Sequence, residues 1–111
     1  MSSGIGINTS GQVVGWSYLS GDSPTNAFLW TASSGMEDLG TLGGENSGAE
    51  AINQGGQNVG YSDTTTSFVT QAALWTAPNQ IQDLGTLGGT FSTATGINDS
   101  GVVVGFSSLP L

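Results

Sequence analysis

A seven-residue motif, DLGTLGG, occurs twice in this chain, at residues 38–44 and again 45 positions later at residues 83–89. The sequence around the motif repeats at the same offset, and residues 7–51 and 52–96 are identical at 22 of 45 positions without a gap. A repeat of this period indicates supersecondary units that stack on one another and share a core with their neighbours. The repeat therefore limits the fold more strongly than any other feature of the chain.

Six residues of each unit recur in a third, partial copy. They are Ile7, Asn8, Gly11, Val14, Gly15 and Ser17 in the first unit, Ile52, Asn53, Gly56, Val59, Gly60 and Ser62 in the second, and Ile97, Asn98, Gly101, Val104, Gly105 and Ser107 in the third. We therefore treat residues 1–111 as a single repeat domain. Residues 1–6 begin the first strand, residues 7–51 and 52–96 are two full repeats, and residues 97–111 are a partial third repeat.

Glycine accounts for 19 of 111 residues and charged residues for only 7%, a composition that favours strands and tight turns. No window has the apolar spacing of three and four residues that an amphipathic helix shows. The sequence predicts four short strands in each unit, near residues 47–52, 57–62, 72–77 and 81–87 in one of them. Residues 36–42 are the equivalent of residues 81–87 in the preceding unit. An Asn-x-x-Gly turn joins the first two of these strands.

Four short antiparallel strands in a unit of this length are typical of a β-propeller blade. We therefore predict an all-β fold of antiparallel four-stranded units of 45 residues, arranged like propeller blades, with about two and a half units in the chain. A parallel solenoid is less favoured, because its coils are usually shorter and more uniform.

The charge of the chain is entirely negative. It has no Lys, Arg or His and eight carboxylates, which gives a formal charge of -8. Because such a chain cannot neutralise phosphates, nucleic acid and anionic membrane surfaces are excluded as partners. A halophilic adaptation is a less favoured interpretation of the acidity, since so few residues are charged. The start of the chain, MSSGIGIN, has neither the basic region nor the apolar run of a signal peptide, and no membrane insertion is expected.

Three motifs recur at a constant spacing: Ile-Asn-x-x-Gly-x-x-Val-Gly-x-Ser, then Ala-x-Leu-Trp-Thr, then DLGTLGG. The first of them reads GIN-x-x-G-x-V-V-G-x-S in the first and third copies. Together they resemble the HAF repeat family of predicted extracellular proteins, over almost all of the chain. The resemblance implies a β-propeller-like repeat protein that is secreted or held at the cell surface, and it implies no particular reaction. The family's His-Ala-Phe reads Asn26-Ala27-Phe28 and Gln71-Ala72-Ala73 here, so a role that needs the imidazole is absent, although an amide could replace a structural histidine.

The sequence offers few groups for catalysis or for a cofactor. Without His, Lys, Arg or Cys there is no ordinary base for a serine nucleophile, no Schiff-base amine and no thiolate, so we expect no enzyme and no catalytic residues. Asp38 with Asp83 is the obvious choice for a glycosidase-type pair, but the two occupy equivalent places in separate units. Each is better explained as an acceptor of backbone N–H bonds at a strand end. No cofactor is expected. Asn98-Asp99-Ser100-Gly101 resembles a fragment of a calcium loop, but its equivalents at residues 8–11 and 53–56 carry no carboxylate, and zinc lacks His and Cys ligands.

Aromatic side chains and variable loops are the candidates for ligand binding. Trp30, Trp75, Trp16 and Tyr61 could stack on a carbohydrate, although recurring aromatics inside strands are better explained by packing between units. Residues 19–26 and 64–71 differ between the units while their flanks persist, which is typical of surface loops and of binding sites.

The two ends of an open array would expose strand edges and apolar faces. The residues predicted to lie on these edges are Ile5, Ile7, Val14, Trp16, Ile97, Val104 and Phe106. We therefore expect copies to associate head to tail as a homo-oligomer, in a ring or a filament. Two function classes follow: a non-enzymatic, self-associating extracellular structural protein, and alternatively a propeller-type module that binds carbohydrate or another ligand.

Overall fold

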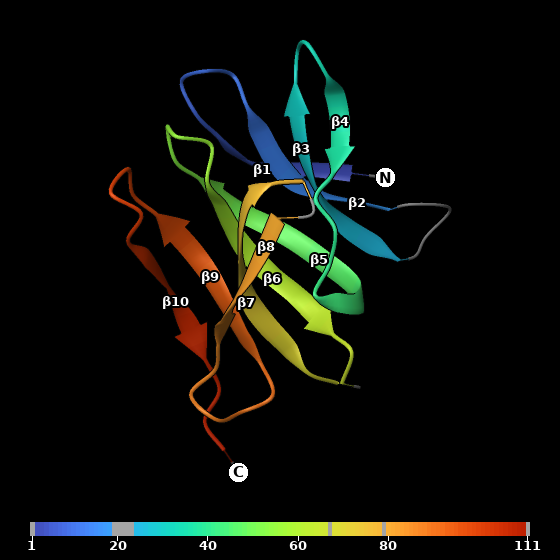
Figure 1. Ribbon diagram of the computed structural model, residues 1–111, viewed down its shortest axis with the longest axis vertical. Coiled ribbons are helices and arrows are strands. Elements are labelled where there is room, and N and C mark those ends of the chain that lie inside the picture. Colours follow the sequence, from blue (N-terminus) through green and yellow to red (C-terminus); the bar gives the residue numbers. More distant parts are fainter. Residues whose placement is uncertain (1, 19–23, 67, 79, 111) are drawn as a thin grey trace.

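The computed structural model describes residues 2–18, 24–66, 68–78 and 80–110. These residues form three antiparallel sheets in the orders β1-β2-β3-β4, β5-β6-β7-β8 and β10-β9 (Figure 1). The predicted all-β class with antiparallel four-stranded units is confirmed. Within these ranges the chain forms no helix, and therefore none that could cross a membrane.

The strand bounds follow the repeat. The strands are β1 (Ser2–Ile7), β2 (Val13–Tyr18), β3 (Thr25–Thr31), β4 (Gly35–Asp38), β5 (Gly43–Ile52), β6 (Asn58–Thr64), β7 (Thr70–Ala77), β8 (Gln80–Gly85), β9 (Ser92–Ile97) and β10 (Val103–Ser107). The predicted repeats 7–51 and 52–96 have the same period as the sheets. The boundary between residues 51 and 52 nevertheless falls inside β5, because each sheet begins with the strand that precedes its Asn-x-x-Gly turn.

The fourth strand of each unit is shorter than the sequence suggested. Residues 36–42 and 81–87 were expected to be extended, but β4 ends at Asp38 and β8 ends at Gly85. Backbone conformation explains the difference, because Gly40 and Gly85 have positive φ angles of 86° and 83°. Such angles favour glycine and interrupt a strand.

The Asn-x-x-Gly turns form as predicted. In each turn the glycine N–H donates to the asparagine carbonyl, at 3.1 Å in the first unit, 3.2 Å in the second and 3.0 Å in the third. The asparagine side-chain oxygen accepts further backbone N–H groups of its own turn. Gly11, Gly56 and Gly101 all have positive φ, which explains why the sequence keeps glycine there.

Each unit has a β-bulge between its first two strands. The register shifts at equivalent places in the three sheets, leaving one extra residue in the first strand: Ile5, Glu50 or Thr95. Opposite the bulge lies the recurring glycine of the second strand, Gly60 in the middle sheet, whose backbone touches that of β5. A bulge bends and twists the strand that contains it, so all three sheets are shaped in the same way.

Two clusters of buried side chains form the core, one at each boundary between sheets. The first contains Val14, Ala27, Leu39, Ala49, Ala73 and Trp75, and the second contains Val59, Ala72 and Ala94. The first strand of each following sheet packs on the preceding sheet, β5 on β1, β2 and β3, and β9 on β5, β6 and β7. The three residues of the second cluster are the equivalents of Val14, Ala27 and Ala49, so both boundaries use the same positions.

A row of asparagine hydrogen bonds joins the three turns, which lie side by side in Figure 1. The side-chain amide of Asn8 donates to the carbonyl of Asn53 at 3.0 Å, and that of Asn53 donates to the carbonyl of Asn98 at 3.0 Å. Beside this row, the Thr9 N–H donates to Gln54 Oε1 and the Gln54 N–H donates to Asp99 Oδ1, both at 2.9 Å. Each bond therefore recurs one unit later.

Serine hydroxyls on the following sheet hold the other side of each boundary. Ser47 accepts the Ala27 N–H at 2.8 Å and donates to the Gly40 carbonyl at 3.0 Å. Ser92 makes the same two bonds to Ala72 and Gly85, each at 2.7 Å. The two boundaries therefore share these serine hydrogen bonds.

Candidate functional site: the two ends of the repeat array

The outer face of the β1–β4 sheet is the first end of the array. It carries Ile7, Trp30 and Met36, which are exposed. In the next sheet, the residues equivalent to Trp30 and Met36 are Trp75 and Ile81, which lie in or against the first core cluster. Trp30 is 38% exposed and Trp75 is 0% exposed. The same tryptophan position is therefore covered inside the array and uncovered at its end.

The outer face of the β9–β10 sheet is the second end. Val14 and Val59 are both 0% exposed because the next sheet covers them, whereas the equivalent Val104 is 62% exposed. Phe106 is exposed on the same strand, with its ring 5.8 Å from that of Phe91. This end presents apolar residues at positions that the array buries elsewhere.

Hydrogen-bonding groups repeat this pattern. Asn8 and Asn53 are buried and their side-chain amides cross to the next unit. Asn98 is exposed, and among the described residues its amide nitrogen has no acceptor, although its oxygen is held by the turn. The second end therefore has a free donor where the interior has an interunit bond.

A groove of about 400 Å³ opens beside β10, between the β9–β10 and β5–β8 sheets. Leu84 and Leu87 line one side and Ala94 lines the other. Leu84 and Leu87 are the equivalents of Leu39 and Leu42, which pack in or against the first core cluster. Sequence reasoning predicted exposed edges here but did not find this groove, because it arises only where the two sheets meet.

The structure separates the residues that were proposed for ligand binding. Trp75 is enclosed in the core, so its ring offers no surface to a ligand in this fold. Trp16 is half-buried and packs edge to face on Tyr18, with ring centroids 5.7 Å apart. Tyr61 is half-buried against the backbone of Gly48 in β5. Trp30 is the member of the set that lies at an end of the array.

The residues proposed for the assembly edges also fall into two groups. Ile5, Ile7, Val104 and Phe106 are exposed at the two ends, as an assembly surface requires. Val14 lies in the first core cluster and Ile97 packs against the second, so these two residues stabilise the array from within. Trp16 is half-buried and packs on Tyr18 rather than standing exposed at an edge.

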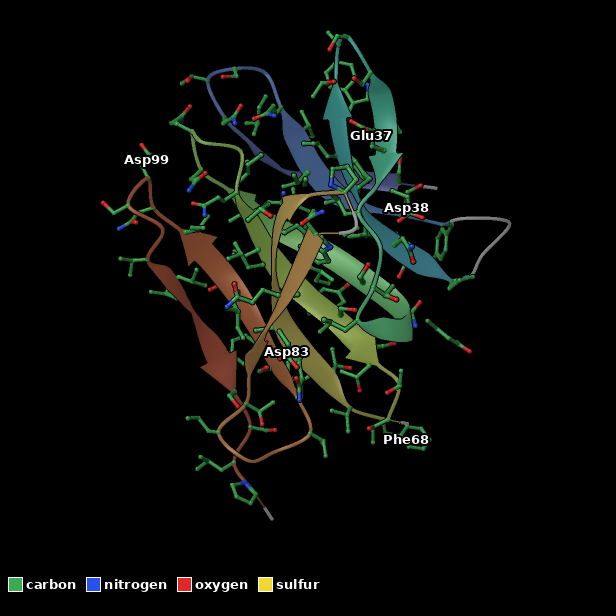
Figure 2. All side chains as sticks on the ribbon, in the orientation of Figure 1. Glu37, Asp38, Phe68, Asp83 and Asp99 are labelled. Atoms are coloured by element: carbon green, nitrogen blue, oxygen red, sulfur yellow. The ribbon has the colours of Figure 1, made fainter. Side chains whose placement is uncertain are left out.

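Asp38 and Asp83 lie on separate sheets and apart from each other in Figure 2. As predicted, each carboxylate accepts a backbone N–H two residues on, from Gly40 at 2.8 Å and from Gly85 at 2.7 Å. Asp38 also accepts the side-chain amide of Asn26 at 2.8 Å. Asp38 ends β4 and Asp83 lies two residues before the end of β8, and the structure does not join the two carboxylates into an acid–base pair.

Metal ligands do not gather in the described ranges, where no group of three or more Asp or Glu residues comes together. Asp99, the residue considered for calcium, instead accepts the Gln54 N–H. Its position at the tip of the third turn is visible in Figure 2.

One feature of the β6–β7 connection was not predicted. Phe68 is 96% exposed and has a positive φ of 64°, and its ring projects from the molecule in Figure 2. A cleft of about 630 Å³ lies beside it, lined by Glu45, Asp63 and several threonines. The loop prediction for residues 64–71 covers this connection, but Thr70 and Gln71 belong to β7. In the other predicted loop, residues 19–26, Thr25 and Asn26 belong to β3. Residues 19–23 and 67 lie outside the described residues.

Tyr61 gives the molecule a pH dependence in the alkaline range. Burial raises the pKa of its phenol, and the carboxylates of Glu50 and Asp63 raise it further. An unfolded tyrosine has a pKa of about 10, so below that pH both states keep the proton and stability is unaffected. Above about pH 10 the unfolded chain releases its proton first, so stability falls as the pH rises through the folded pKa.

We therefore expect Tyr61→Phe to lose less stability than the wild type between roughly pH 9.5 and 11, as measured by urea unfolding. Tyr18→Phe serves as the control for the removal of one phenol. Equal pH profiles for the wild type and Tyr61→Phe would contradict the assignment.

Comparisons with protein-family models, with curated proteins and with solved structures gave no match for this chain.

Proposed function

We propose that this chain is a non-enzymatic, self-associating repeat protein, a structural module whose copies join end to end. Its four-stranded units act as propeller-like blades, and copies extend the array as a ring or a filament. The resemblance to the HAF repeats supports an extracellular location. The partner is a second copy of the same chain.

One observation carries this proposal: positions that are buried at both internal boundaries are exposed at the ends. Val104 is the clearest case, because both of its equivalents are fully covered by the next sheet. Hydrogen bonding shows the same difference, because the side-chain amides of Asn8 and Asn53 donate to the next unit whereas the amide of Asn98 has no following unit to donate to among the described residues. Since the two internal boundaries use the same residues and bonds, each end carries half of an interface that the molecule already makes.

Charge opposes the association but does not prevent it. Each copy carries a formal charge of -8 and no positive side chain, so copies repel one another at low ionic strength. At about 0.15 M salt the Debye length is about 8 Å, so most of this repulsion is screened. Exposed β-strand edges without lysine are not protected against pairing.

The test is to substitute one exposed valine of the second end and compare it with a matched valine. Val104→Gln should weaken association by roughly tenfold to a hundredfold, because burying a valine contributes about 1.5–3 kcal/mol. Val102→Gln is the control, since Val102 is 59% exposed but its equivalents are the glutamines Gln12 and Gln57. Sedimentation velocity at about 0.15 M salt measures both variants. If both substitutions weakened association equally, or if neither weakened it, the proposed interface would be contradicted.

A carbohydrate-binding module is the second candidate, favoured by the β6–β7 loop. An exposed aromatic ring beside carboxylates and hydroxyls is an arrangement that can stack on and hydrogen-bond to a sugar. A glycan array probed with the wild type, Phe68→Ala and the exposed-aromatic control Phe91→Ala would test it. Binding lost only in Phe68→Ala would support this role, and an array without hits would contradict it.

A further inference from the structure

We propose that the groove beside β10 is a binding site for a β-hairpin, and that its occupant is the β3–β4 hairpin (residues 25–38) of a second copy. The inference rests on the proposed self-association and names the segment that performs it. In the joined state, β9–β10 of one copy takes the place of β1–β2 in the next. The array then continues through a sheet shared by the two copies, in which β9 and β10 of one copy pair with β3 and β4 of the other in the order β9-β10-β3-β4.

The first support is that β10 is nearly a duplicate of the strand that β3 already pairs with. Residues 13–17 read VVGWS and residues 103–107 read VVGFS. One edge of β10 pairs with β9 and its other edge has no partner strand among the described residues. Figure 1 shows β10 as the outermost strand on that side of the molecule. An extended segment can add to such an edge through backbone hydrogen bonds.

The second support is that the register of the pairing already occurs twice in the molecule. Val13 lies opposite Trp30 in the first sheet, and Asn58 lies opposite Trp75 in the second. One unit later the same register places Val103 of one copy opposite Trp30 of the other, with Gly105 opposite Phe28. Side chains at the position of Trp30 would then face the β5–β8 sheet, as Trp75 faces the β1–β4 sheet.

The third support is that the groove has the lining that an indole meets at the filled boundary. Trp75 belongs to a cluster with Leu39, Ala49 and Ala27, and the equivalents Leu84, Ala94 and Ala72 all line the groove. Among the described residues, the β9–β10 sheet has no strand equivalent to β7, and no tryptophan lines the groove. A hairpin that carries Trp30 supplies the missing side chain.

The exchange nearly conserves backbone pairing and covers apolar side chains that are exposed in the single chain. The β3–β4 hairpin gives up β2 and gains β10, a strand with four of the same five residues, so the number of backbone hydrogen bonds is nearly conserved. Trp30 moves from a half-exposed face to an enclosed one, and Leu84 and Leu87 become covered. The released β1–β2 hairpin is the cost that limits the affinity.

The experiment adds a fluorescein-labelled peptide of residues 24–40 to the full chain and follows fluorescence anisotropy. Saturable binding is expected, and it should be at least tenfold weaker for the Trp30→Ala peptide and for the chain variant Leu84→Ala. The variant Val102→Gln should bind the peptide like the wild type. Because the chain has no cysteine, a Ser107→Cys chain can be paired with an Asn26→Cys peptide to test the register, and a disulfide should form under mild oxidation. A Thr31→Cys peptide, out of register, should not cross-link.

The outcomes separate this proposal from self-association in general. If the full chain associates but the peptide neither binds nor competes, the hairpin is not the occupant and self-association stands. If the chain stays monomeric but binds the peptide with the stated tryptophan dependence, the groove is confirmed and the proposed function is contradicted. Equal binding of the wild-type and Trp30→Ala peptides would overturn the assignment of the indole to the groove.

Discussion

Replacing Trp75 with alanine is expected to lower the free energy of unfolding by about 4 kcal/mol, the usual range for removing a buried aromatic side chain. Trp75 is the largest fully buried side chain and lies at the boundary between two sheets. Its loss leaves Leu39 and Ala49 facing a cavity that the rigid strands around it cannot close. Small domains are stable by only about 5–15 kcal/mol, so this substitution removes a large part of the total.

Trp30→Ala is the matched control, because the two residues occupy the same place in successive units. Trp30 has no sheet over it, so its loss should cost only about 1–2 kcal/mol of monomer stability. Urea unfolding followed by circular dichroism measures both variants, with an unchanged denaturant slope as the check that unfolding remains two-state. Equal costs at the two positions would show that burial between units does not stabilise the fold.

Gly60→Ala is the second large effect, with an expected loss of at least about 3 kcal/mol. A Cβ atom at Gly60 would overlap the carbonyl oxygen of Gly48 and lie 2.9 Å from the Cα of Ala49. Both atoms belong to the backbone of the bulged strand β5, so no side chain can move aside to relieve the clash. Glycine at this position therefore keeps β5 and β6 paired next to the bulge.

Gly55→Ala provides the comparison within the same unit. Gly55 lies in the Asn-x-x-Gly turn, its φ is not positive, and the nearest atom to an added Cβ is Asn53 Oδ1 at 3.5 Å. Its substitution should change stability by no more than about 0.5 kcal/mol. Thermal unfolding of both variants measures the two changes in stability. A Gly60→Ala protein as stable as the wild type would contradict the prediction, because it would mean that β5 and β6 can move apart at the bulge without a loss of stability.

Much of the fold could be predicted from the sequence, because many of the repeated residues determine the backbone conformation of their own neighbours in the chain. Asn53 and Gly56 define a turn by their own chemistry, and Asp38 ends β4 while accepting the N–H of Gly40. These interactions lie within a few residues of one another, where spacing is informative.

The remaining features depend on contacts between units that spacing alone does not specify. The recurrence of Ser62 and Ser107 was visible, but their bonds to the N–H groups of Leu42 and Leu87, at 2.7 Å and 2.8 Å, cross to the preceding unit. The close approach at Gly60 required the bulge, which a regular alternation does not predict. Phe68 lies in a connection without a repeated counterpart, so no comparison between units could identify its backbone conformation.

The mass of the wild-type chain in solution tests the central claim, that the ends of the array are unpaired halves of its internal interface. Sedimentation equilibrium over a wide range of concentration, at about 0.15 M salt, gives this mass directly. We expect the mass to rise with concentration through multiples of 11.1 kDa, and Val104→Gln to shift that rise to higher concentration. A constant mass of 11.1 kDa at every concentration would contradict the account.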